Sequence, residues 1–152
     1  MSEEQTRPLR TMTRTVGALR EHDVRFALAG GWAVYEPAHD VDVLIREEDR
    51  SAVLDAVERW GMAVRDTVED WPVRTYDGQQ LVDLIHRPDE HPVDRALLDR
   101  AERIRVGPVA VPVMSATHLV IDRMLVFGPH RCDLAETLLI ALSCVSSSTG
   151  RW

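Results

Sequence analysis

Apolar residues recur at helical spacing in several stretches of the chain. In the first of them Leu9, Met12, Val16 and Leu19 share one face, which predicts an amphipathic helix over 8–22. The same spacing occurs in a stretch that ends at Gly61 and in another that follows Ser115, a residue suited to cap a helix. Further helices are expected at 47–61, 93–100, 116–127 and 131–145, with a short helix start at 32–35.

Shorter runs of apolar and β-branched residues predict strands. The stretch "VRFALA" (24–29) is largely apolar, whereas "DVDVLI" (40–45) alternates before it becomes apolar, as a central strand with one open end does. Other strands are expected at 63–68, 71–76 and 80–86, followed by two short edge strands within 104–114. This order predicts an α/β (α+β) fold, in which a mixed β-sheet is flanked by helices and a helix pair ends the chain.

Length and charge narrow the class of protein. A chain of 152 residues predicts one domain over 1–152, with a core at about 24–113 and C-terminal helices at about 115–145. The net charge of −7 argues against a broad nucleic-acid-binding surface, which needs clustered basic residues. No apolar run approaches the roughly 20 residues that cross a bilayer, and the first ten residues lack the apolar core of a signal peptide. We therefore expect a cytoplasmic protein with no membrane partner.

Two aspartates stand one residue apart in an apolar strand. Asp40 and Asp42 would project from the same face, about 6.6 Å apart along the strand. Like charges at this spacing repel unless a cation lies between them, and Mg2+ pairs such carboxylates with substrate phosphates. Asp83, in "LVDLI", is a third acid of the same kind. If the two strands are neighbours, three carboxylates converge on a two-metal cluster suited to phosphoryl or nucleotidyl transfer.

A glycine pair precedes this strand. A strand followed by Gly30 and Gly31 and then a helix start would present backbone N–H groups to a phosphate. His39 would add positive charge beside it, and Arg74 and Arg46 are further candidates for phosphate contacts. Candidates for stacking on a nucleotide base are Trp32, Trp71 and Tyr76.

The combined pattern resembles a known superfamily. "AGGWAVYEPAHDVDVLI" (29–45) with the later "LVDLI" is similar to the nucleotidyltransferases with a DNA polymerase β-like core. It looks most like their small bacterial branch, which includes the aminoglycoside and lincosamide nucleotidyltransferases. "VPVMSATHLVIDRML" and "RCDLAETLL" are similar to the helix pair of that branch, so the resemblance runs over about 26–142.

The resemblance implies a reaction and roles for the residues. ATP or another NTP would bind with two Mg2+ ions, its β- and γ-phosphates held by Gly30 and Gly31. Asp40 and Asp42 would bind both metal ions, and Asp83 would bind the catalytic metal and help to deprotonate an acceptor hydroxyl. The products would be pyrophosphate and a nucleotidylated small molecule, protein or RNA.

Two alternatives stand beside this interpretation. The segment between the glycine pair and Asp40 is short, and the chain ends soon after the helix pair. These features suit a catalytically impaired binding or regulatory module, such as an antitoxin-like partner, or an acceptor site completed by a homodimer or a second subunit. "DVDVL" also fits the nucleophile strand of haloacid dehalogenase-like phosphatases, but the chain has no lysine, which that active site requires.

Overall fold

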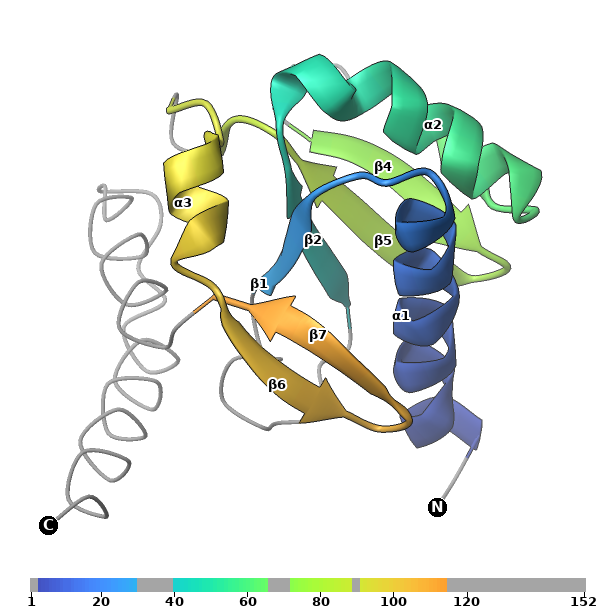
Figure 1. Cartoon of the computed structure of the whole chain (residues 1–152). Helices are drawn as coiled ribbons and strands as arrows, with labels where there is room; N and C mark the ends of the chain where they lie inside the picture. Colours follow the sequence, from blue (N-terminus) through green and yellow to red (C-terminus); the bar gives the residue numbers. More distant parts are fainter. Residues whose placement is uncertain (1–2, 30–39, 66–71, 89–90, 115–152) are drawn as a thin grey trace, which may run out of the picture.

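A mixed β-sheet is the centre of the computed structural model, which describes residues 3–29, 40–65, 72–88 and 91–114. In these residues seven strands pair in the order β3-β4-β5-β2-β1-β7-β6 (Figure 1). The strands are β1 (Phe26–Ala29), β2 (Val41–Ile45), β3 (Ala63–Arg65), β4 (Pro72–Asp77), β5 (Gln80–Ile85), β6 (Glu102–Val106) and β7 (Val109–Val113). The helices are α1 (Glu3–Glu21), α2 (Arg50–Arg59) and α3 (Arg95–Asp99), with a 3-10 turn at Glu47–Asp49. The predicted α+β class is confirmed.

The pairing of the sheet is both parallel and antiparallel. β2 lies between β1, which runs antiparallel to it, and β5, which runs parallel to it. β7 pairs with β1 in parallel, and the Met114 amide continues this contact by donating to the Leu28 carbonyl at 2.8 Å. The two acidic strands, β2 and β5, are therefore neighbours, as the three-carboxylate hypothesis requires.

Helices α1 and α2 cover one face of the sheet. The predicted stripe of α1 is buried, with Met12 and Leu19 0% exposed, and it packs with Val53 and Val57 of α2. Figure 1 shows α1 and α2 beside each other over the strands. None of the helices in the described residues is long and apolar enough to cross a membrane.

Two predicted boundaries and one predicted edge strand were wrong. Helix α1 begins at Glu3 rather than at Pro8, because a proline in the helix removes only one backbone hydrogen bond and the acidic start favours the helix dipole. Of the two strands predicted as edge strands within 104–114, only β6 lies at an edge of the sheet, since β7 pairs on both sides. Helix α3 starts two residues late, where the Asp94 side chain accepts from the Leu97 amide at 2.7 Å. The expectations for 32–35, 116–127 and 131–145 lie outside the described residues.

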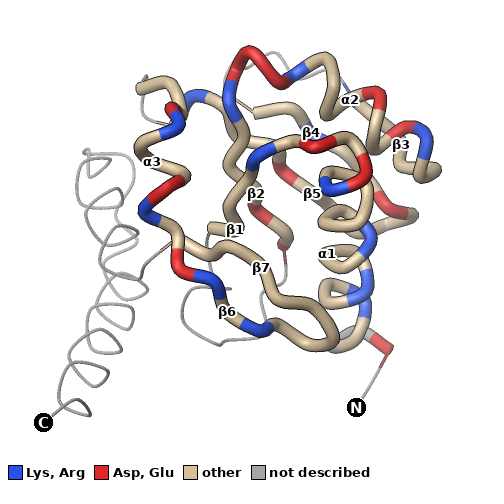
Figure 2. Tube along the Cα trace, in the orientation of Figure 1, with Lys and Arg blue, Asp and Glu red and all other residues tan. Residues whose placement is uncertain are grey.

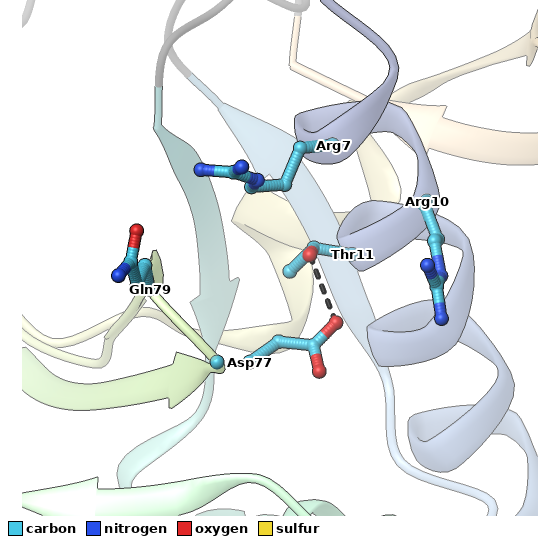
Figure 3. A pocket seen from close by; sticks show the side chains of 6 residues that line it. Arg7, Arg10, Thr11, Asp77 and Gln79 are labelled. Carbon is cyan, nitrogen blue, oxygen red and sulfur yellow. Dashed lines mark hydrogen bonds between the residues drawn. The ribbon is translucent and has the colours of Figure 1, made fainter. Parts of the chain in front are cut away.

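The hairpin of β4 and β5 is fastened to α1 by one carboxylate. Asp77 accepts a hydrogen bond from Thr11 of α1 at 2.9 Å (Figure 3). It accepts another from Arg14 of the same helix. Gly78 follows at φ +64, a conformation that a two-residue hairpin turn needs and that a side chain disfavours. Asp77 therefore links the start of this hairpin turn to α1.

We expect Asp77→Ala to lower the free energy of unfolding by about 2 kcal/mol, because the change leaves the Arg14 guanidinium without its carboxylate. The Asp77 side chain is only 13% exposed. Urea denaturation measures the effect. The matched control is Asp99→Ala, whose ion pair with Arg25 is 59% and 46% exposed and should contribute less than about 1 kcal/mol. Equal losses in both variants would contradict this role of Asp77.

Candidate active site

Two carboxylates face each other across the middle of the sheet. Asp42 of β2 and Asp83 of β5 are direct register partners on parallel strands, and neighbouring strands lie about 4.8 Å apart. Both side chains project from the face opposite α1 and α2, because the residues on either side of them point into the core. Val41 and Val43 are 0% exposed, and so are Val82 and Leu84. The alternation in the sequence thus brings two acids to one point.

The surroundings of this pair differ along the strands. Two residues after Asp42, Leu44 is buried in a small apolar cluster with Leu98 of α3 and Met114. Asp42 itself is partly exposed, and the Asp83 side chain is 21% exposed. Within the described residues, therefore, α3 covers one end of this face and leaves the carboxylates accessible at the other end.

Asp40 lies at the open end of the same strand. It is exposed and precedes β2 directly, two residues before Asp42. No group of three or more His, Cys, Asp or Glu side chains that could hold a metal ion occurs in the part of the chain that the structure describes. Of the three predicted metal ligands, the structure brings Asp42 and Asp83 together, and Asp40 does not join them in such a group.

Arg74 is the cationic member of the site. It is the register partner of Asp83 on β4, and its Nε lies 3.5 Å from Asp83 Oδ1. The Arg74 side chain is 44% exposed, although its Nε and Asp83 Oδ1 are themselves buried. The guanidinium offsets part of the repulsion between the two carboxylates.

Arg65 extends this arrangement and was missed in the sequence. It is the register partner of Arg74 on β3, and its guanidinium carbon lies 4.8 Å from the centre of the Tyr76 ring. At that distance the arginine is attracted by the face of the ring. Tyr76 is therefore a platform for Arg65 in this structure. Only the strand register reveals Arg65 as part of the site, because the local sequence does not show which residue of β4 lies opposite Arg65.

The remaining candidates divide in two groups. Arg46 binds within its own turn, to Glu48 and Asp49 at 2.8 Å each, and the hydrogen bond to Asp49 raises its pKa above the ordinary value. The other candidates lie outside the described residues; they are Gly30, Gly31, Trp32, His39 and Trp71. Ala29, which leads into the glycine pair, lies opposite Asp42.

The donor set fits a hard divalent cation. Asp42 and Asp83 supply carboxylate oxygens from adjacent strands, and Asp40 supplies a further carboxylate two residues away. Mg2+ takes oxygen ligands and is commonly held by one or two carboxylates together with substrate phosphates. The residues present therefore match the requirements of Mg2+ better than those of zinc, which prefers nitrogen and sulfur.

Known structures share this architecture. The solution structure of the antibiotic-resistance factor ANT(2'')-Ia has 18% sequence identity and a TM-score of 0.68, covering 92% of this chain and 85% of that chain. The crystal structure of ANT(2'')-Ia in complex with adenylyl-2''-tobramycin has 17% identity and a TM-score of 0.68, covering 90% and 87%. The lincomycin-bound lincosamide antibiotic adenylyltransferase LnuA has 12% identity and a TM-score of 0.60, covering 94% and 96%.

These similarities show a nucleotidyltransferase-like fold. No protein-family profile and no curated protein sequence matches the chain. The fold predicted from the glycine pair and the aspartates is therefore confirmed by three-dimensional similarity.

Proposed function

We propose that the protein is a Mg2+-dependent nucleotidyltransferase. It transfers the NMP of an NTP, such as ATP, to a hydroxyl group of a small-molecule, protein or RNA acceptor. The observation that carries this proposal is the position of Asp42 directly opposite Asp83 on the accessible face of a nucleotidyltransferase-like sheet. Facing carboxylates repel each other unless positive charge lies beside them, and divalent cations would supply such charge.

Different residues bind the metal ions, bind the phosphates and accept the proton. Asp40, Asp42 and Asp83 hold two Mg2+ ions, which neutralise charge on the phosphates when bound. Gly30 and Gly31, with His39, bind the β- and γ-phosphates. The acceptor oxygen bonds to the α-phosphorus while the bond from this phosphorus to the bridging oxygen breaks. The Asp83 carboxylate accepts the hydroxyl proton, and pyrophosphate leaves.

Asp83→Asn is expected to abolish transfer without unfolding the protein, because the amide keeps the shape of the side chain and loses its basicity and charge. The assay incubates the protein with α-labelled ATP, GTP, CTP or UTP and Mg2+, and measures released pyrophosphate and labelled product. Asp55→Asn, a change of an exposed aspartate on α2, is the matched control. Equal rates in the two variants, or no Mg2+-dependent turnover in the wild type, would count against the enzyme.

A binding or regulatory module is the second candidate function. The observation that favours it is the Arg74–Asp83 contact at 3.5 Å, in which an arginine occupies part of the space beside a carboxylate. Such a module would form a stable complex with a partner protein in the presence of a chelator. An increase in melting temperature that needs both NTP and Mg2+ would instead support the enzyme. A homodimer or second subunit that completes the acceptor site belongs to the first proposal, and size-exclusion chromatography tests it.

A further inference from the structure

Four charged residues form one row across the sheet. Arg65, Arg74, Asp83 and Asp42 are successive register partners on β3, β4, β5 and β2. Directly opposed residues of paired strands project from the same face. Two cations therefore lie on one side of the row and two carboxylates on the other.

The cationic half of the row is open to a ligand. Arg65 is exposed and Arg74 is 44% exposed. The Arg65 guanidinium lies over the Tyr76 ring, a contact that uses none of its N–H groups as hydrogen-bond donors to a carboxylate or phosphate. Arg74 contacts Asp83 through Nε, at a distance longer than a good charged hydrogen bond, and carries its two terminal amino groups beyond that contact. Together they offer the planar donor groups that bind carboxylate or phosphate.

The two ends of this row lie at different distances from the glycine pair that follows β1. Ala29, which leads into the phosphate-binding glycine pair, lies opposite Asp42 on β1. Arg74 lies on β4, three strands from β1 and about 14 Å away at the usual strand spacing. Asp83, the base for the acceptor hydroxyl in the proposed function, stands between them. In the proposed function the nucleotide phosphates would therefore lie on the β1 side of Asp83, opposite the arginines.

We propose that Arg74 and Arg65 form the acceptor subsite and that the acceptor is a small anionic hydroxyl compound, carrying a phosphate or a carboxylate. This inference rests on the proposed function. The arginines attract the anionic group and place the neighbouring hydroxyl at Asp83, and they repel a cationic acceptor such as an aminoglycoside.

The overall charge favours a small acceptor over RNA. The protein carries a net charge of −7, and Figure 2 shows acidic and basic residues interspersed along the described elements. An RNA strand needs a continuous basic track that neutralises several phosphates. Two arginines beside one catalytic carboxylate match a single anionic group.

The experiment compares acceptors that differ in charge on one sugar framework: glucose 6-phosphate, glucuronate, glucose and glucosamine. Calorimetry measures the binding of each to the full chain with Mg2+ and a non-hydrolysable ATP analogue, and α-labelled ATP measures transfer. We expect the two anionic compounds to bind at least tenfold tighter than glucose and glucosamine. The double variant Arg65→Gln/Arg74→Gln should lose this preference and keep its affinity for the ATP analogue within about twofold. Arg103→Gln, on the distant edge strand β6, is the matched control.

Several outcomes would overturn the inference. These are equal binding of all four sugars, a preference for glucosamine, transfer to an RNA 3′ end alone, or a tenfold loss of affinity for the ATP analogue in the double variant. The last result would assign the arginines to the nucleotide. Failure of the proposed function is seen separately, as an ATP affinity that neither Mg2+ nor Asp42→Asn changes, whatever the sugars do.

Discussion

Replacing Asp42 with asparagine is expected to lower the rate of nucleotidyl transfer by at least about 10^3-fold. Asp42 faces Asp83 across adjacent strands, and in the proposed function both carboxylates hold the divalent cations that bind the triphosphate. Asparagine keeps the size and one oxygen but removes the charge that balances the metal. A loss of this size corresponds to about 4 kcal/mol of transition-state stabilisation, within the range that bound metal ions supply.

The fold of this variant should be intact or slightly more stable. The change removes repulsion between facing carboxylates, which is worth roughly 0.2–1 kcal/mol for a cross-strand pair. The rate of transfer in steady-state kinetics should therefore fall, while the melting temperature without nucleotide stays the same or rises slightly. A variant that keeps most of its turnover, or that loses turnover because its melting temperature collapses, would contradict the role given to Asp42.

Leu28→Ala is expected to destabilise the protein by about 3 kcal/mol, the typical cost of the cavity that this change leaves in a well-packed core. Leu28 is 0% exposed in β1, which pairs with β2 on one side and β7 on the other. Because whole domains are stable by only about 5–15 kcal/mol, the melting temperature should fall by roughly 10 °C.

The control for this prediction is the same substitution at the rim of the core. Leu54 of α2 is partly buried against the main cluster, so Leu54→Ala should cost about half as much or less. Urea denaturation at constant slope measures both changes. If Leu54→Ala costs more than Leu28→Ala, the core is not centred on the β1–β2–β5 strands.

The order and type of most elements followed from local patterns. The alternation in "DVDVLI" and "LVDLI" predicted which residues of β2 and β5 point inward, since neighbouring residues of a strand face opposite sides. The stripe from Met12 to Leu19 predicted the buried face of α1 in the same way. Boundaries were less accurate, because a proline near a helix start can be accommodated inside the helix.

The sequence did not predict which strands pair with each other. Nothing local distinguishes β7, which pairs with β1, from an edge strand, because the pairing is decided by contacts between distant segments. The same holds for Arg65, which reaches the site only through the register of β3 with β4. Arg74 was singled out as a phosphate partner, but its position beside Asp83 came from the register of β4 with β5.

By itself the sequence determined the face on which each residue of a strand lies, and with it the presence of two acids, Asp42 and Asp83, on partly exposed positions of apolar strands. Side-chain alternation is a property of the backbone and needs no partner strand. The tertiary structure alone decided that Asp42 and Asp83 meet, and that two arginines continue their row. Register depends on the packing of the whole sheet against α1 and α2, and a shift of one residue would have turned these side chains to the other face.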